Sequence, residues 1–508
     1  MRKLGIAIIV LGIIWQLVLV ETVFSVGGAL FIEQRSEDVF FDCSQTDGTL
    51  RQFGEINVGP LPVYGKEGVD ISSQYNEIGI SFVRTHDFFG PTDVSFIFPN
   101  WSADPLLESS YDFSLSDEYV SAIVDAGCEV FYRLGESASD NESLRMVPSD
   151  FEKYAEVCKH IMMHYNEGWA DGFRFDIKYW EIWNEPDLSG FWNGSAQQYY
   201  EFYEKVSTVL KDHNDSLLIG GPCTSSIDDE RFTTDFLEFV ASNDLPLDFY
   251  SWHRYAKSPF HLYEGSVFVR EMLDSFGLTS VENINTEWNI DILTPQREKD
   301  NEKNAAFTAA CLSALQDSGL DYGFRYRGPQ DDSWLLRVIG FDLSLFSADG
   351  FYKSPALSYL AMNNMVSGTP LRLSSDVIDA EDGFTALGSR DQAGTNITIL
   401  LSNFESGNVE CNLNLSNLPF DDEYSVGLFR IDEEHHFELV SAQNFSSDFF
   451  EYNIDVQQNS VVFVRLTNSS VFPSNGPEVM SLPWWSNVRI FDFFFKVLGI
   501  ILMMIAFG

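Results

Sequence analysis

The feature that most constrains the fold is a regular alternation of short β-rich runs with amphipathic helical stretches between about residue 50 and residue 366. Eight such runs that alternate with helices over roughly 300 residues are typical of an α/β fold of the (β/α)8 type, the TIM barrel. An open doubly wound sheet is the alternative, but no glycine-rich phosphate loop follows the first run. The predicted strands are Glu55–Val58, Ile80–Thr85, Glu129–Leu134, Tyr179–Trp183, Leu217–Gly221, Phe249–Trp252, Asn283–Glu287 and Gly323–Tyr326.

The pattern changes after about residue 366. Residues 367–470 contain short alternating strands separated by turn clusters, which predicts a C-terminal β-sandwich domain. The β-rich segment 26–49, which precedes the barrel (50–366), is a candidate to add strands to this sandwich. Residues 471–488 contain three prolines and read as a stalk.

Composition excludes one class of partner. The chain has 508 residues and a formal net charge of −45, from 76 Asp+Glu against 31 Lys+Arg. Such an acidic surface repels polyphosphate, so we expect no nucleic-acid partner. No internal repeat is visible, which argues against a structural surface-layer protein built from β-rich repeats.

Six cysteines are too few for a disulfide scaffold, and none shows the CxxC spacing of a metal site. Four of them fall in apolar strand or helix patterns and are read as buried thiols. Cys43 and Cys411 lie in β-like segments at opposite ends of the folded region, so either two free thiols or a bridge between them is open.

Both ends of the chain carry apolar segments. Residues 1–25, with Met-Arg-Lys before an apolar run, read as a signal peptide or signal anchor. Residues 489–508 form a hydrophobic tail, either a membrane anchor or a lipid-anchor signal. Together with eight glycosylation sequons, these segments predict an extracytoplasmic protein, secreted or at the cell surface, with possible membrane attachment. The sequons begin at Asn100, Asn141, Asn193, Asn214, Asn396, Asn414, Asn444 and Asn468.

Two carboxylates stand where a barrel places its active site. The predicted fourth strand ends in Trp-Asn-Glu-Pro, with Glu185 just before Pro186, and the seventh contains Thr-Glu-Trp, with Glu287. Side chains at the C-terminal ends of barrel strands meet at one rim. Glycosidic cleavage needs such a pair, because one carboxyl group protonates the leaving oxygen while the other attacks or activates water. Glu181, in the fourth strand, is read as structural.

These motifs resemble those of glycoside hydrolase family 39, which contains β-xylosidases and α-L-iduronidases. The likeness spans residues 50–366. It rests on Trp183-Asn-Glu-Pro-Asp187 with Phe191-Trp192, on Gly79-Ile-Ser-Phe-Val-Arg-Thr-His-Asp87, on Ser251-Trp-His-Arg254 and on the closing stretch from Gly340-Phe341 to Lys353-Ser-Pro355. The resemblance implies a retaining mechanism, with Glu185 as acid/base and Glu287 as nucleophile. It implies a glycan substrate, and neither a metal nor an organic cofactor is expected.

The neighbouring strand ends supply candidate substrate-binding residues. Asn184 is a candidate for the sugar 2-hydroxyl group, since that contact strengthens in the transition state. The remaining candidates are His86 and Asp87 for sugar hydroxyls, His253 and Tyr255 to orient Glu287 or line the pocket, and Trp288, Trp192 and Phe191 as stacking walls.

The sugar itself is less constrained. A lysine soon after the sixth-strand histidine is typical of the iduronidases, and Tyr255 stands there instead. This departure favours a neutral sugar and an exo-acting, β-xylosidase-like enzyme. An enzyme for acidic glycans remains the alternative, with Arg325 or Arg327 as the group that binds a uronate, although a structural ion pair is the favoured role for these arginines. A catalytically silent glycan-binding surface protein is the alternative of another class. The sequence leaves the oligomeric state open.

Overall fold

The computed structural model describes residues 35–480 apart from 63–67, 87–89, 138–145, 229, 331–339, 375–382, 421–422, 470–471, 473–475 and 478. The predicted signal segment, the hydrophobic tail, most of the stalk, Asp87 and the sequon at Asn141 lie outside the described residues. None of the helices in the described ranges has the length and apolar character needed to span a membrane.

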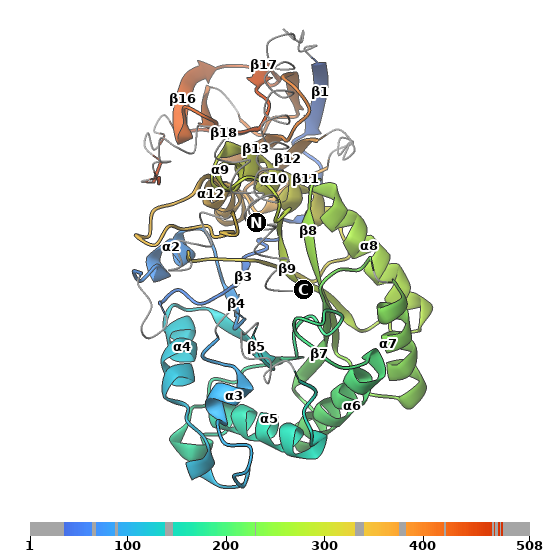
Figure 1. Cartoon of the computed structure of the whole chain (residues 1–508). Helices are drawn as coiled ribbons and strands as arrows, with labels where there is room; N and C mark the ends of the chain where they lie inside the picture. The colour runs from blue at the N-terminus through green and yellow to red at the C-terminus, as the bar shows by residue number, and fades with distance from the viewer. Residues whose placement is uncertain are drawn as a thin grey trace, which may run out of the picture.

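Eight parallel strands close into a barrel in the order β10-β3-β4-β5-β6-β7-β8-β9 (Figure 1). Each of the eight predicted runs overlaps one of these strands, which confirms the (β/α)8 fold. The strands are β3 (Glu55–Asn57), β4 (Phe82–Arg84), β5 (Glu129–Leu134), β6 (Tyr179–Ile182), β7 (Leu218–Thr224), β8 (Phe249–Ala256), β9 (Glu282–Ile290) and β10 (Tyr322–Arg325).

Some of the helices that surround the barrel begin at side-chain caps that the sequence supplies. Asp150 accepts a hydrogen bond from the backbone N–H of Lys153 at the start of α5, and Ser195 and Gln198 form a capping box at the start of α6. The helices are α2 (Ser72–Glu77), α3 (Val94–Ile97), α4 (Ser114–Asp125), α5 (Phe151–Asn166), α6 (Ala196–His213), α7 (Glu230–Asn243), α8 (Phe260–Ser275), α9 (Gln296–Asp300), α10 (Glu302–Ala314) and α12 (Ser354–Gly368).

Two further sheets lie beyond α10 and α12 and confirm the predicted sandwich (Figure 1). The larger has the order β16-β15-β18-β13-β12-β11-β2, and the smaller has the order β1-β14-β17. Strands β1 and β2 come from the segment before the barrel, so this segment pairs with the C-terminal strands. The bounds are β1 (Arg35–Asp42), β2 (Thr46–Thr49), β11 (Leu371–Leu373), β12 (Phe384–Arg390), β13 (Asn396–Asn403), β14 (Val409–Ser416), β15 (Tyr424–Ile431), β16 (His436–Phe445), β17 (Phe450–Val456) and β18 (Ser460–Thr467).

The inner strands β13 and β18 of the larger sheet are buried on both faces. Leu400 and Phe463 on one face belong to the apolar cluster of the barrel, whereas Leu401 and Val462 belong to the cluster between the two sheets. Seven consecutive residues of β13 are buried, without the alternation of a strand that has one solvated face. The sandwich is therefore joined to α10 and α12 by a shared core.

The bridge considered between Cys43 and Cys411 is not formed, and all six cysteines are free thiols. Parallel pairing of β1 with β14 sets Cys411 beside Glu37, whereas the backbone N–H of Cys43 donates to the carbonyl oxygen of Ser416. At about 3.3 Å per residue, the two cysteines lie roughly 20 Å apart along the sheet, far beyond the reach of a disulfide.

Candidate active site

The inside of the barrel contains two layers of side chains. The apolar layer lies nearer the N-terminal ends of the strands, and the polar layer lies nearer their C-terminal ends. The apolar layer takes its side chains from strands β4, β5, β6, β8, β9 and β10 and contains edge-to-face contacts, such as that of Phe82 with Phe131 at 5.7 Å. Because Cβ atoms alternate along a strand, the residue two positions after Phe82 also points inward, and it is Arg84. The apolar layer comprises Phe82, Phe131, Tyr179, Phe249, Ile284 and Phe324.

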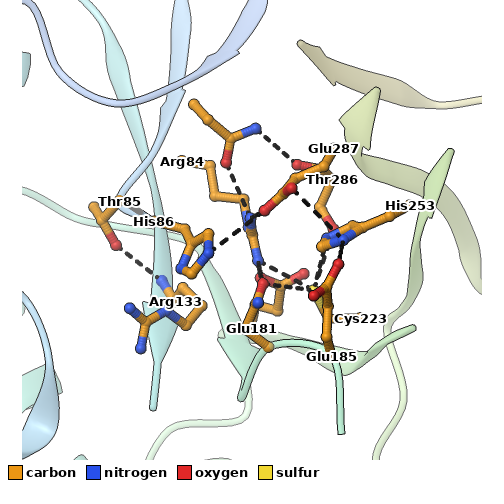
Figure 2. A network of polar contacts seen from close by, with 12 residues as sticks. Arg84, Thr85, His86, Arg133, Glu181, Glu185, Cys223, His253, Thr286 and Glu287 are labelled. Carbon is orange, nitrogen blue, oxygen red and sulfur yellow. Dashed lines mark hydrogen bonds and ion pairs between the residues drawn. The ribbon is translucent and has the colours of Figure 1, made fainter. Parts of the chain in front are cut away.

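Arg84 is the charged centre of the polar layer and is completely buried. Its guanidinium lies 2.7 Å from Oε2 of Glu181 and 2.9 Å from Oε1 of Glu287 (Figure 2). These contacts hold the pKa of Arg84 above its usual value, although burial alone would lower it. Burying a cation is favourable only with such paired and hydrogen-bonded partners. Glu181 therefore has the structural role that the sequence indicated.

The predicted nucleophile, Glu287 in β9, is held from two sides. Besides Arg84 on Oε1, Tyr255 Oη donates a hydrogen bond of 2.6 Å to Oε2. His86 Nε2 lies 3.5 Å from Oε1. Donors on both oxygens, one of them a cation, fix the orientation of this carboxyl group.

The predicted acid, Glu185, is in a different environment. Its side chain is 13% exposed, and its Oε1 lies 2.8 Å from Nδ1 of His253. Burial, together with the nearby charge of Asp187, raises the pKa of Glu185 to about 8, although Arg84 opposes the shift. The backbone of Glu185 has a left-handed φ of +46°, a strained conformation of the kind found at functional sites. Glu185 is thus protonated at neutral pH.

Asn184 precedes Glu185 in the chain and contacts Arg84, which in turn contacts Glu287. Its Oδ1 accepts a hydrogen bond of 2.8 Å from Nη2 of Arg84, so the amide orientation is fixed. Its Nδ2 is buried and has no hydrogen-bond partner within the described part of the chain. The nitrogen is left as a donor, as the predicted contact with a sugar hydroxyl requires.

His86 and His253 both reach the two-glutamate centre, as their strand ends predicted. His86 is buried, and burial reinforced by the charge of Arg84 lowers its pKa well below the usual range. Burial also lowers the pKa of His253. Both imidazoles are neutral at neutral pH. The ring of Phe191 lies 6.5 Å from that of His86, so this aromatic side chain stands beside the site.

Trp288 and Trp192 are not stacking walls, contrary to the prediction. Trp288 follows the inward Glu287 and therefore points outward, where it is 1% exposed and donates its Nε1–H to the carbonyl oxygen of Gly323. Trp192 is 2% exposed and packs edge-to-face on Trp183 at 5.2 Å. Both are core residues.

Arg325 also points outward and is excluded as a uronate-binding group. Its guanidinium donates to Oγ1 of Thr308 and to Oδ1 of Asn289 and lies 5.0 Å above the ring of Trp288. These partners are uncharged, so the ion pair expected for Arg325 is absent from its contacts with described residues.

Two residues of this centre were not singled out from the sequence. Arg84 could have been found, because a lone arginine two positions after an inward phenylalanine in a barrel strand must point inward. Cys223, at the end of β7, gives no comparable signal. Its Sγ lies 3.0 Å from Nε2 of His253 (Figure 2).

Glu185, His253 and Glu287 each bring one ligand-type atom within 4.8 Å of the other two. Such a group could ligate a cation in principle. However, Glu287 already contacts the cation of Arg84 at 2.9 Å and the hydroxyl group of Tyr255 at 2.6 Å. This arrangement fits a site that holds and moves a proton better than one that binds a metal ion.

The family model for glycosyl hydrolases family 39 matches residues 69–328, which carry the barrel strands β4 to β10 and both glutamates. The chain belongs to this family. A β-xylosidase of Geobacillus stearothermophilus is 26% identical over 218 residues, which are 39% of this chain and 42% of that enzyme. The chain thus spans less than half the length of this relative.

Solved structures of the same fold cover more of the chain. A glucosidase from Croceicoccus marinus superimposes with a TM-score of 0.74 at 24% identity and covers 86% of this chain and 100% of that one. A β-xylosidase from Caulobacter crescentus superimposes with a TM-score of 0.68 at 15% identity and covers 85% of this chain and 99% of that one. At these identities the likeness concerns the fold.

Proposed function

We propose that the chain is a retaining glycoside hydrolase that cleaves O-glycosidic bonds, with Glu287 as nucleophile and Glu185 as acid/base. The observation that carries the proposal is the proximity of the two groups, since one oxygen of Glu185 lies within 4.8 Å of one oxygen of Glu287. Retaining enzymes hold their carboxyl groups about 5–5.5 Å apart, whereas inverting enzymes separate them by about 6.5–9.5 Å to admit a water molecule.

The first step is glycosylation. Glu287 attacks the anomeric carbon, the bond from this carbon to the leaving oxygen breaks, and the leaving oxygen takes the proton of Glu185. In the second step, the Glu185 carboxylate removes a proton from water, the water oxygen attacks the anomeric carbon, and the ester to Glu287 breaks. The product keeps the anomeric configuration of the substrate.

The different surroundings of the two glutamates support this assignment. Burial keeps Glu185 protonated with a pKa of about 8, whereas the two oxygens of Glu287 accept hydrogen bonds from Arg84 and from Tyr255. Two carboxyl groups in such different environments are the pattern of an acid and a nucleophile. A catalytically silent binding protein would not need this difference.

We propose a neutral sugar and exo action on β-xylosides. The β-xylosidase of G. stearothermophilus supports this substrate, and so does the position of Tyr255, which donates to Glu287 where an iduronidase would present a lysine. Arg84 is engaged with two glutamates, and Arg325 points away from the site. One observation favours the acidic-glycan alternative, because Arg327 lies near enough to His86 to help lower its pKa.

We further propose an extracytoplasmic location, on the basis of the apolar N-terminal segment and the eight sequons. Asn100 and Asn193 lie in sequons of the described ranges and are exposed, as glycan attachment requires. Peptide-N-glycosidase digestion of the protein from its native host should lower its mass. An unchanged mass would argue against glycan attachment.

Hydrolysis of a panel of aryl glycosides by the full chain tests the function. The panel comprises the β-xyloside, β-glucoside, α-arabinoside, α-iduronide and β-glucuronide. We expect turnover of the β-xyloside, abolished in Glu287→Ala and strongly reduced in Glu185→Ala. Glu271→Gln, an exposed glutamate of α8, is the matched control and should keep full activity. Turnover that survives Glu287→Ala would refute the mechanism, and preference for the α-iduronide would replace the proposed substrate.

A further inference from the structure

Cys223 lies at the centre of the hydrogen-bond network, although the two-step mechanism does not use it. It is completely buried at the C-terminal end of β7. Its Sγ lies 3.1 Å from Nη2 of Arg84 and 3.0 Å from Nε2 of His253 (Figure 2). His253 in turn contacts Glu185, so the thiol group is one residue removed from the proposed acid.

The donors and acceptors along this path favour one direction. A guanidinium has donors only, so Arg84 donates to the sulfur. Burial raises the pKa of Cys223 well above its usual value, so the group is a thiol and has one proton to donate. The nearest acceptor for this proton is Nε2 of His253 at 3.0 Å, compared with Oδ1 of Asn184 at 3.4 Å and Oγ1 of Thr286 at 3.6 Å.

The other nitrogen of His253 points to the same conclusion. Nδ1 lies 2.8 Å from Oε1 of Glu185 and 3.7 Å from Oε2 of Glu287. Once Glu185 has given up its proton, its carboxylate only accepts hydrogen bonds, so a proton on Nδ1 is favourable in that state. The imidazole is neutral and has a single proton to place. Nε2 then has a lone pair, which can accept a hydrogen bond from the thiol group.

We propose that Cys223 is a positioning residue that fixes His253 as the Nδ1–H tautomer, so that His253 donates to Oε1 of Glu185 and leaves the acid proton on Oε2. The direction of donation runs from Arg84 through Cys223 and His253 to Glu185. The Oε2 atom of Glu185 has no hydrogen-bond partner among the residues that the structure describes. This inference rests on the acid/base role proposed for Glu185.

The tautomer matters for proton transfer. With a proton on Nδ1, His253 stabilises the Glu185 carboxylate that forms as the leaving oxygen takes the proton. With the proton on Nε2 instead, Nδ1 would accept a hydrogen bond from the Glu185 carboxyl group and hold its proton away from the substrate. Removal of the thiol group therefore weakens general-acid catalysis without removing a group that touches the substrate.

The direct test is the tautomer of His253, read from the side-chain ¹⁵N chemical shifts of the full chain and assigned with His253→Gln. We expect the Nδ1–H form in the unaltered protein and in Cys223→Ser, whose hydroxyl group can still donate. We expect loss of this form, wholly or in part, in Cys223→Ala. An Nε2–H form in the unaltered protein, or an unchanged Nδ1–H form in Cys223→Ala, would overturn the proposal. This readout needs no enzymatic activity, so it decides the inference even if the proposed function fails.

Kinetics supply a second test. The parameter kcat/KM reports glycosylation, in which a poor leaving group needs the acid and a good one does not. For Cys223→Ala we expect a loss of about 10- to 100-fold on the phenyl glycoside and less than about 3-fold on the 2,4-dinitrophenyl glycoside, because general-acid catalysis contributes about 10²–10⁴-fold. Cys158→Ala, a buried thiol of α5, is the matched control and should change neither value. Equal losses on both substrates would assign Cys223 a merely structural role and overturn the proposal.

Discussion

Replacement of Arg84 by methionine tests whether this buried cation holds the centre together. Methionine keeps much of the volume and removes the charge. Glu181 and Glu287 would then be buried without the cation that lies 2.7 and 2.9 Å from them. Removal of one partner of a buried ion pair costs about 3–5 kcal/mol. We therefore expect Arg84→Met to lower the free energy of unfolding by about this amount.

The assay is urea unfolding followed by tryptophan fluorescence at pH 7 and at pH 5. At the lower pH the stranded carboxylates gain protons more readily, so the deficit of Arg84→Met should shrink. The double variant Arg84→Met/Glu181→Gln should recover at least about 1 kcal/mol, since the two groups are coupled. Arg372→Met is the control, because its pair with the 38% exposed Asp317 should contribute only about 0–1 kcal/mol. A loss for Arg84→Met no larger than that of this control would refute the reasoning.

Three further predictions concern activity. Tyr255→Phe removes one hydrogen bond to a carboxylate, worth about 1.5–3 kcal/mol. It should therefore lower kcat/KM for the aryl xyloside by about 10- to 150-fold. An unchanged value would show that the 2.6 Å contact does not assist Glu287. Because Glu185 acts in its protonated form, kcat/KM should fall as the pH rises through about 8, and Glu185→Gln should abolish this limb of the pH profile; a limb that persists would belong to another group. Trp192→Phe should lower the thermal unfolding temperature and leave KM unchanged. A raised KM would show that this residue contributes to sugar binding.

The barrel could be predicted because its signal is local. Most of the strands are short runs rich in apolar and aromatic residues, and helical stretches separate them, as the structure reproduces. Glu185 and Glu287 could be predicted for a related reason, since strand ends converge at one rim in any barrel. The side chains of Asn184, His86, His253 and Tyr255 meet there as well.

The errors arose where the direction of a side chain decided the outcome. Trp288 follows an inward glutamate, and Arg325 follows the inward Phe324, so the two-residue period of a strand places both outside the barrel. Trp192 lies in a loop, where no such period applies, and its burial depends on helix α6 packing against it. The register of β1 on β14, which separates Cys43 from Cys411, is a contact between distant parts of the chain that no local pattern encodes.

The central claim is that Glu287 forms a covalent bond with the sugar. Incubation of the full chain with a 2-deoxy-2-fluoro-β-xyloside that has a good leaving group should slow the second step and trap the ester. Peptide mass mapping is predicted to find the fluoroxylosyl group on Glu287, with no label in Glu287→Ala. A label on another residue, or turnover of the aryl xyloside with inversion of the anomeric configuration, would contradict the account.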